Sequence, residues 1–274
     1  MTARMSGATW RTINGLLTAG VLVVFLASCQ RAERLRGQGP VSGPHVGLGW
    51  TSPRSQMEFV WVPSLDMWVG KYEVTNAEYR GGKPRHRTEG FGKYRLDGDR
   101  QPVVGVSFHN AVAYADWLTG KERAAGHLSD SLRYRLPTEE EFMAYAQCGD
   151  GREYPWGNGW PPEHGNYSGH ESAWEHKIVG YGDGCPVSCD VEECWANPWG
   201  LHGVGGNVGE ICAKDANASQ AFGAWRGASW LDSQRDQLRC SFRMGNATAS
   251  AGSVGLRLDS AVTTVVGFRL VLSR

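Results

Sequence analysis

The pattern of apolar and polar positions predicts a few short elements in the first half of the chain. The segments 57–62 and 68–74 are rich in aromatic and β-branched residues, which is typical of strands. Two Thr-x-x-Glu sequences, at Thr75 and Thr138, have the form of a capping box and predict helix starts. Ser107 is a further candidate N-cap, because apolar residues recur after it at helical spacing on one face: Phe108, Ala111, Tyr114, Ala115 and Leu118.

The second half, from about residue 150 to 274, shows little helical periodicity. Gly, Trp, Pro and Asn punctuate short stretches there, as in 154–158, and the aromatic residues can supply a core. Helices followed by loops and short strands predict an α+β domain. We expect a loop-rich domain over residues 56–274, with two helices and short antiparallel strands.

The N-terminus carries an apolar run, 16–27, after a basic start. This run is too short to cross a bilayer, which needs about 20 residues. It predicts a secretory signal over residues 1–28, and Cys29 after Leu-Ala-Ser resembles the lipobox of bacterial lipoproteins. We therefore expect an acylated Cys29, a flexible tether over 29–55 and a lipid anchor in the bacterial envelope, at the outer membrane and cell surface. The alternatives are an ordinary signal peptide and a chance apolar N-terminus with an unrelated cysteine.

Composition adds two constraints. Lys and Arg total 28 and Asp and Glu total 28, so the formal net charge is zero. This balance argues against a nucleic-acid partner, because binding a polyanion needs surplus positive charge on one face. The chain also has 37 Gly and 12 Trp, which favours loops held by aromatic anchors.

Six cysteines remain once Cys29 is set aside, and an even number in an exported chain permits up to three disulfides. The sequence leaves their pairing open. The spacing within 185–194 is not the paired Cys-x-x-Cys arrangement of zinc sites, which disfavours a metal centre. The six are Cys148, Cys185, Cys189, Cys194, Cys212 and Cys240.

Several short motifs stand in a recognisable order. They are Gly70–Asn76, Pro102–Phe108, Arg135–Glu139, Pro155–Gly157, Gly206–Glu210, Arg226–Trp230 and Gly267–Leu270. In this order they resemble the formylglycine-generating enzyme (sulfatase-modifying factor) family, from about residue 56 to the C-terminus. The resemblance implies a variant of the C-type lectin fold, and a fold of this kind does not fix a function.

The resemblance implies a specific chemistry for the enzymes of the family. They oxidise a substrate cysteine with a pair of active-site cysteines, copper and oxygen, and the pair lies between the Arg226–Trp230 motif and the final Gly-Phe-Arg. This interval offers Cys240, whereas the partner position falls on Arg235, Asp236 or Gln237. A lone thiol cannot provide a two-thiolate copper site. We therefore expect a protein that is not an enzyme, with Cys240 buried or disulfide-bonded; a copper-dependent formylglycine-generating oxidoreductase is the alternative.

The resemblance also implies a calcium loop at 206–210. Glu210 keeps a carboxylate there, but Gly203 stands where the family carries an Asn or Asp side chain. Calcium takes six to eight oxygen ligands, so the loss of one lowers affinity. We expect no cofactor, with Glu210 as a weak calcium candidate.

A second branch of the family fits the chain better, namely the variable lipoproteins diversified by retroelements, of the Treponema variable protein type. Their variable segment begins at an Arg-Gly-Gly-Ser-Trp-like motif and ends at a Gly-Phe-Arg-Leu motif, which implies 226–270 as the candidate segment here. Val254–Leu258 nearly repeats Val266–Leu270, and either Gly255 or Gly267 could begin the final motif.

The residues between the anchors of this segment are mixed and mostly polar, which suits an adaptable binding pocket. An ordinary solvent-facing loop is the alternative. We expect a surface lipoprotein that binds an external protein or glycan without chemistry, and a structural envelope module is the remaining alternative. The candidate ligand-binding residues are Leu231, Asp232, Ser233, Arg235, Asp236, Phe242, Met244 and Asn246.

Overall fold

The computed structural model describes residues 43–217, 221–244 and 262–274. The predicted signal peptide, the predicted lipidation site Cys29, the candidate ligand residue Asn246 and the repeat at Val254–Leu258 lie outside these residues. Within the described ranges, no helix is long and apolar enough to cross a membrane.

A five-stranded antiparallel sheet joins the start of the folded region to its end. The strand order is β1 (Trp50–Thr51), β2 (Glu58–Val62), β3 (Met67–Gly70), β9 (Val271–Ser273) and β4 (Arg133–Arg135). The C-terminal strand β9 lies between β3 and β4, so the last residues of the chain complete a sheet that the first strands begin. The short 3₁₀ turn η1 (Pro63–Leu65) connects β2 to β3.

Strand β1 lies within the predicted tether. Trp50 pairs with Phe59 of β2, and its indole Nε1 donates to the Tyr134 hydroxyl at 3.0 Å. Ser52 is fully buried and its hydroxyl bonds the buried Glu122 carboxylate. The folded domain therefore begins before residue 56, and the predicted tether of 29–55 is too long. A two-residue strand has no periodicity that a sequence pattern could reveal.

The helices begin where the capping sequences predict. Thr75 and Thr138 each accept a hydrogen bond from the amide three residues later, and the glutamate there accepts from the threonine amide, which completes both capping boxes. Ser107 accepts from the Asn110 amide at 3.3 Å. The described residues thus contain three main helices rather than two, and a four-residue helix near the C-terminus: α2 (Asn76–Gly82), α3 (Phe108–Ala124), α4 (Glu139–Ala146) and α5 (Val262–Val265).

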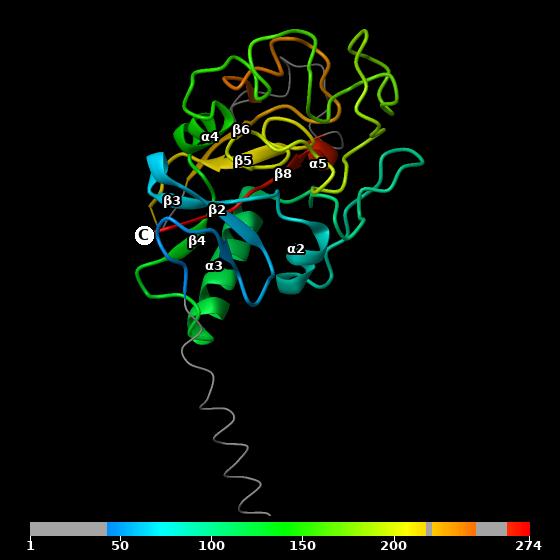
Figure 1. Cartoon of the computed structure of the whole chain (residues 1–274). Coiled ribbons are helices and arrows are strands. Elements are labelled where there is room, and N and C mark those ends of the chain that lie inside the picture. The colour runs from blue at the N-terminus through cyan, green and yellow to red at the C-terminus, as the bar shows by residue number, and fades with distance from the viewer. Residues whose placement is uncertain (1–42, 218–220, 245–261) are drawn as a thin grey trace, which may run out of the picture. The chain divides into compact units, whose positions relative to one another are not determined.

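A second, four-stranded sheet has the order β7 (Arg243–Met244), β6 (Phe222–Arg226), β5 (Gly209–Ala213) and β8 (Val266–Gly267). Its β5 and β8 run parallel, and its other pairs are antiparallel. Every residue of β5 is buried. Helix α4 packs against β5 and β6, whereas α3 packs beside β4 of the first sheet (Figure 1).

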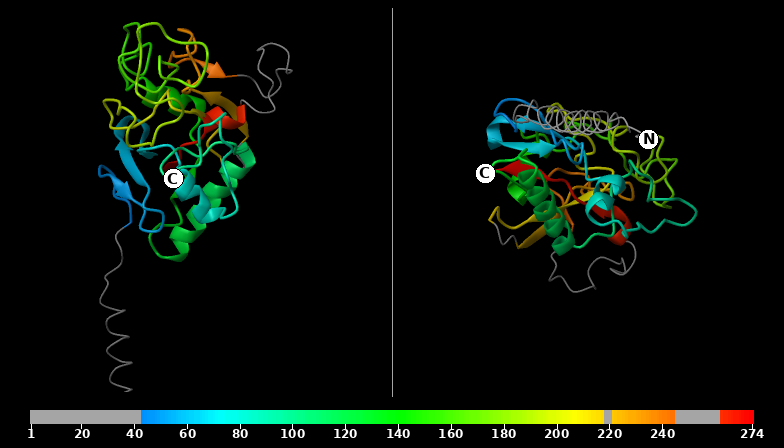
Figure 2. Two further views of the ribbon diagram at one scale, coloured as in Figure 1. Left: turned by 90° about the vertical axis from the view of Figure 1, so that its right-hand side faces the viewer. Right: turned by 90° about the horizontal axis from the view of Figure 1, so that it is seen from below.

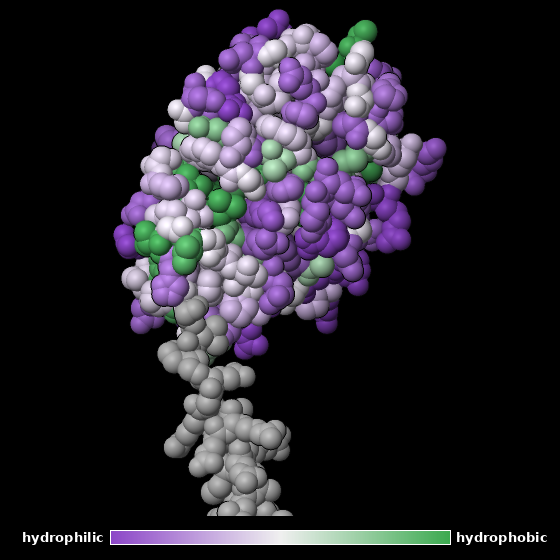
Figure 3. Space-filling view, in the orientation of Figure 1, coloured by the Kyte–Doolittle hydropathy of each residue, from purple (hydrophilic) through white to green (hydrophobic). Residues whose placement is uncertain are grey.

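Long loops gather at one end of the domain, away from α3 (Figures 1 and 2). They comprise residues 147–208, between α4 and β5, and 227–242, between β6 and β7. These loops have a small core of their own, built on Tyr154, Tyr167 and Leu238. The face shown in Figure 3 is mainly polar, with scattered apolar side chains. The expectation of an α+β, loop-rich fold with aromatic anchors is confirmed.

Candidate functional site

Two of the long loops meet in a cluster that we call the arginine–aromatic surface. Trp160, Arg235 and Asp236 are exposed, Arg239 is half-buried, and both arginines lie over the buried ring of Tyr154. The guanidinium carbon of Arg235 lies 6.0 Å from the Tyr154 ring centroid and 5.8 Å from that of Trp160. The Arg235 Nε donates to the Tyr154 hydroxyl at 2.7 Å. Arg239 lies over the same tyrosine ring at 5.7 Å. Cations over aromatic faces are attracted by the ring quadrupole, so both arginines are held in place.

The aromatic loop is fixed by its own hydrogen bonds. Tyr154 and Gly157 exchange backbone hydrogen bonds of 2.8 and 3.0 Å, and Trp156 donates its indole N–H to the Gly159 carbonyl. The Tyr154 and Trp156 rings stack with their centroids 4.7 Å apart. The Cys240 amide donates to the Glu153 carbonyl at 2.8 Å, which ties this loop to the segment that carries the arginines. The surface is therefore preorganised.

The charges on this surface are accessible. Asp236 has 89% of its side chain exposed and accepts a hydrogen bond from the Arg239 Nε at 3.0 Å. Glu153 pairs with the other end of the Arg239 guanidinium. Its hydrogen bond to Tyr154 raises the pKa of Arg235, so this side chain stays cationic. Trp160 is 37% exposed, an unusual exposure for an indole.

Two of the candidate ligand residues are structural. Leu231 packs in the main core, and Asp232 is only 8% exposed. The Asp232 carboxylate accepts hydrogen bonds from the amide and the hydroxyl of Ser229, both at 2.8 Å. Burial raises the pKa of Asp232. The prediction that Leu231 and Asp232 contact a ligand is therefore wrong. Both residues anchor the turn after Trp230. The sequence could not show this for Asp232, because a short polar side chain that hydrogen-bonds nearby backbone looks the same in sequence as one that faces a ligand.

The remaining candidates divide between two places. Arg235 and Asp236 belong to the arginine–aromatic surface, and the half-buried Ser233 lies just before them in the same loop. Phe242 and Met244 are half-buried, and Met244 is paired with Trp225 at the edge of the second sheet, where it packs against the main core.

Sequence reasoning missed three members of the surface. Tyr154 and Trp160 come from a loop about 80 residues before the arginines, and Arg239 is not among the candidate ligand-binding residues. A tryptophan within the polar sequence Asn158–Pro162 was the one signal that could have indicated an exposed aromatic side chain.

Cys240 lies directly beneath this surface. It is 1% exposed, and its Sγ lies 3.6 Å from the Ala146 carbonyl. Burial, with a smaller contribution from the nearby Cys148 thiol, raises the pKa of the Cys240 thiol to about 12. The thiol is therefore neutral near pH 7 and a poor metal ligand as it stands. The prediction of a buried Cys240 is confirmed, and the structure gives it no disulfide.

A cysteine pair nevertheless exists elsewhere in the loops. Cys185 and Cys189 form a disulfide, and their sulfurs and a Glu193 carboxylate oxygen all lie within 4.8 Å of one another. Cys189 also lines a cavity of about 210 Å³ together with Asp183. Burial, with the neighbouring Glu171, raises the pKa of Asp183 to about 7. The lone Cys240 therefore does not decide against redox chemistry in this chain, which corrects the argument from a missing pair.

Glu210, the weak calcium candidate, is occupied by protein groups. Its Oε1 accepts from the Arg269 Nε at 3.0 Å and Nη2 at 2.8 Å, and its Oε2 accepts from the Tyr145 hydroxyl at 2.8 Å. All three side chains are fully buried. Both oxygens of the Glu210 carboxylate thus already accept hydrogen bonds from protein groups, and one of these groups is a cation, so Glu210 is a poor fit for a calcium ion.

The same network contains Glu73, a second buried carboxylate. Its Oε1 accepts from Asn207 at 3.3 Å, and its Oε2 lies 4.0 Å from the Arg269 guanidinium and makes no hydrogen bond. Burial raises the pKa of Glu73 to about 7, against the attraction of Arg269. Gly203 has φ of +69°, and a Cβ there would lie 2.4 Å from the Glu73 carboxylate, so the absence of a side chain at Gly203 leaves room for it.

This buried network also identifies the final motif. Phe268 and Arg269 are fully buried between β8 and β9, and Arg269 donates to the carbonyls of Gly70 and His202 as well as to Glu210. Gly267 therefore begins the motif that closes the described fold.

Comparison with known proteins agrees with this architecture. A family model, the sulfatase-modifying factor enzyme 1-like domain, matches residues 48–262. The chain belongs to this family. The match starts close to β1, in accord with the early domain boundary, and stops short of Gly267. The buried contacts of Arg269 show that the folded domain continues beyond it.

The curated relatives include formylglycine-generating enzymes, and the similar solved structures include a variable protein. The formylglycine-generating enzyme of Thermomonospora curvata is 34% identical over 161 residues, which are 56% of this chain and 43% of the enzyme. The chain thus spans less than half the length of this curated relative. The Treponema denticola variable protein 1 has a similar structure, with a TM-score of 0.55, 18% identity and coverage of 85% of this chain and 94% of that one. PvdO from Pseudomonas aeruginosa has a TM-score of 0.52 at 18% identity and covers 85% and 100%.

Proposed function

We propose that this chain is a lipid-anchored surface protein that binds an external protein or glycan through the arginine–aromatic surface, without chemistry. The observation that carries this proposal is that Arg235 and Arg239 are held over the buried Tyr154 ring, with Arg235 also over the exposed Trp160. Trp, Tyr and Arg are the residues most enriched among the energetic hot spots of interfaces. An exposed indole such as Trp160 suits the apolar face of a sugar, and guanidinium groups suit its hydroxyl groups, so both ligand classes fit.

The proposal is supported by the fold that this chain shares with the Treponema denticola variable protein 1. The arrangement of the loop adds support, because Arg235 and Asp236 are exposed while the residues on either side are anchored. Side chains at these positions can contact a ligand without disturbing the core. The neutral, buried thiol of Cys240 beneath the surface adds no reactive group to it.

Arrays of extracellular proteins and glycans would test the proposal. A ligand of the wild-type chain should lose at least about tenfold in affinity in Trp160→Ala and Arg235→Ala, because truncating a hot spot costs 2 kcal/mol or more. Lys214→Gln is the matched control, since Lys214 is an exposed cation after β5. Near-ultraviolet circular dichroism would show that each variant keeps its fold. Equal binding by the variants and wild type would refute the assignment, as would the absence of any ligand.

We also propose that the chain is lipid-anchored at Cys29. Expression in a bacterial host with a labelled fatty acid should label the wild type, whereas Cys29→Ser should remain unlabelled. Label in both proteins, or in neither, would contradict the anchor. This outcome is independent of ligand binding by the arginine–aromatic surface.

A copper-dependent oxidase of substrate cysteines is the second candidate function. It is favoured by family membership and by the cluster of Cys185, Cys189 and Glu193. Once the Cys185–Cys189 disulfide is reduced, the two cysteine thiolates are soft ligands that suit copper(I). Incubation with copper, oxygen and a sulfatase-derived cysteine peptide should give no aldehyde if the protein is a binder only. Aldehyde formation that disappears in Cys185→Ser but persists in Cys240→Ser would establish the enzyme and place its cysteines.

A further inference from the structure

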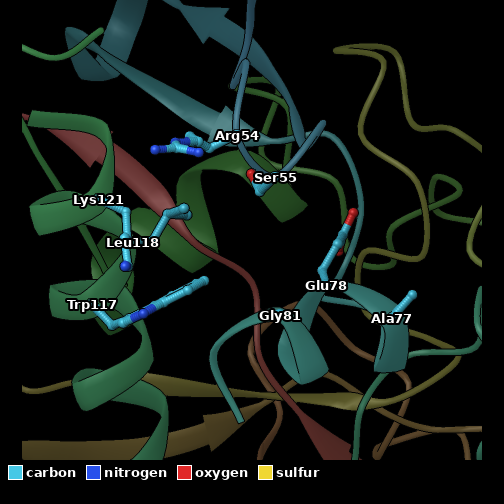
Figure 4. Close-up of a pocket in the computed structure, with 8 residues that line it drawn as sticks. All are labelled: Arg54, Ser55, Ala77, Glu78, Gly81, Trp117, Leu118 and Lys121. Atoms are coloured by element: carbon cyan, nitrogen blue, oxygen red, sulfur yellow. The ribbon is translucent and has the colours of Figure 1, made fainter. Parts of the chain in front are cut away.

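A pocket of about 340 Å³ lies between α2, α3 and the β1–β2 turn, on elements separate from the arginine–aromatic surface (Figure 4). Arg54 and Ser55 come from the turn, Ala77, Glu78 and Gly81 from α2, and Trp117, Leu118 and Lys121 from α3. This volume is at the lower end of the range for small-molecule sites, about 300–1,000 Å³. The pocket therefore suits a small ligand.

One wall of the pocket is aromatic. Trp117 is half-buried and projects from α3 toward α2, as Figure 4 shows. Its ring lies against Tyr114, with centroids 5.4 Å apart and planes tilted by 30°. Gly82 makes this approach possible, because a Cβ there would lie 2.9 Å from the indole. The indole is thus held in a fixed position, and the buried Leu118 extends the apolar surface beside it.

The pocket also holds two cations that the fold does not use. Among the described residues, the Arg54 guanidinium and the Lys121 ammonium have no hydrogen bond or ion pair, and both side chains are exposed. In Figure 4 they lie on the same side of the pocket. Arginine binds carboxylates through paired N–H groups, and an ammonium adds a second charge.

The carboxylates near these cations already have partners. Glu78 accepts from the Thr75 amide at 2.8 Å within its capping box and lies 3.7 Å from Arg100. Glu122, behind the Arg54 backbone, is fully buried and contacts His127 at 2.7 Å as well as the Ser52 hydroxyl. The free charge in the pocket is therefore positive.

We propose that this pocket binds a small carboxylic acid that carries a ring, with its carboxylate between Arg54 and Lys121 and its ring on Trp117. The ring can be aromatic or the C–H face of a sugar, because both bury apolar surface against an indole. This site is independent of the proposed binding of an external ligand by the arginine–aromatic surface.

Titration calorimetry with glucuronate and benzoate tests the two kinds of ring, with glucose and acetate as probes that lack the charge or the ring. At least one ring acid should bind the wild-type protein, and acetate and glucose should bind at least about tenfold more weakly, since each lacks one contact. Arg54→Gln and Lys121→Gln should each weaken ring-acid binding about tenfold or more. Lys214→Gln, an exposed lysine elsewhere, should leave it unchanged.

Gly81→Leu provides an independent steric test. A Cβ at Gly81 would make an ordinary 3.7 Å contact with Trp117, so the leucine side chain can enter the pocket without a clash and with both cations kept. This variant should melt at the wild-type temperature or above, because leucine is a better helix former than glycine, and should lose ring-acid binding. Failure of both acids to bind, acetate binding as tight as theirs, or unchanged binding in Gly81→Leu would overturn the proposal. None of these results would bear on the arginine–aromatic surface, which is tested separately by the binding of array ligands to Trp160→Ala.

Discussion

Replacing Glu73 by glutamine should stabilise the protein above neutral pH and change it little in acid. Glu73 is fully buried, and one of its oxygens has no hydrogen-bond partner. Burial disfavours the charged carboxylate more strongly than Arg269 favours it, so the pKa of Glu73 rises from 4.5 to about 7. The charged form is therefore a net cost to the folded state, even with a cation close by.

The magnitude follows from the shift of the Glu73 pKa. A rise from 4.5 to about 7 is roughly 2.5 units, and each unit is about 1.36 kcal/mol. Between pH 4.5 and 7 the folded state binds more protons than the unfolded state, so stability falls as pH rises. By pH 8 the ionised Glu73 costs about 3 kcal/mol relative to its protonated form. Glutamine carries no charge and avoids this loss.

Urea denaturation at pH 4.5 and pH 8 would measure the effect. The unfolding free energy of Glu73→Gln should exceed that of the wild type by about 3 kcal/mol at pH 8, and by less than about 1 kcal/mol at pH 4.5. Titrating groups that do not interact with Glu73 are common to both proteins and cancel in the difference. Glu58→Gln is the control, because this exposed partner of Lys71 should change stability by about 0.5 kcal/mol or less at either pH. A difference between Glu73→Gln and wild type that is the same at both pH values would refute the reasoning.

Three further predictions concern stability and thiol chemistry. Thr138→Ala removes the side-chain cap of α4 and should lower the unfolding free energy by about 1 kcal/mol in urea denaturation, whereas Thr138→Ser should keep most of it. The Cys185–Cys189 disulfide closes a loop with a sequence separation of 4. Replacing both cysteines by serine should therefore lower the unfolding free energy by about 2 kcal/mol in urea denaturation, and an unchanged midpoint would contradict this. Cys240, with a thiol pKa of about 12 and almost no exposure, should react with a disulfide reagent at pH 8 only after urea unfolds the chain; rapid labelling of the native protein would be inconsistent with its burial.

Local signals in the sequence predicted the helix starts well. A capping box is a contact between residues three apart, so Thr75 and Thr138 carry the whole pattern within one turn. The strand at Trp50 could not be predicted, because some of its contacts are to residues far away in the sequence. Its partners are Phe59 and Tyr134, and no short window of sequence contains a contact over 84 residues.

The same distinction between local and distant contacts applies to the candidate site. The motifs located the segment that bears Arg235, but they could not show that Tyr154 and Trp160 come from a distant loop to meet it. Asp232 looked like its neighbours in sequence and proved to be a buried acceptor for Ser229. Burial decides between these roles, and burial is a property of the packed chain.

The alternation of buried and exposed positions in the candidate segment bears on whether it can be diversified. Leu231 and Asp232 are buried before the exposed stretch 234–236, and Leu238 and Cys240 are buried after it. Surface substitutions away from special features usually change stability by about 0.5 kcal/mol or less, whereas truncating a buried leucine costs about 2–5 kcal/mol. Side chains at 234–236 can therefore change without loss of the fold, while the flanking anchors hold the backbone in place. A segment built in this way can present different ligand contacts on one scaffold, so the architecture is compatible with a variable binding surface.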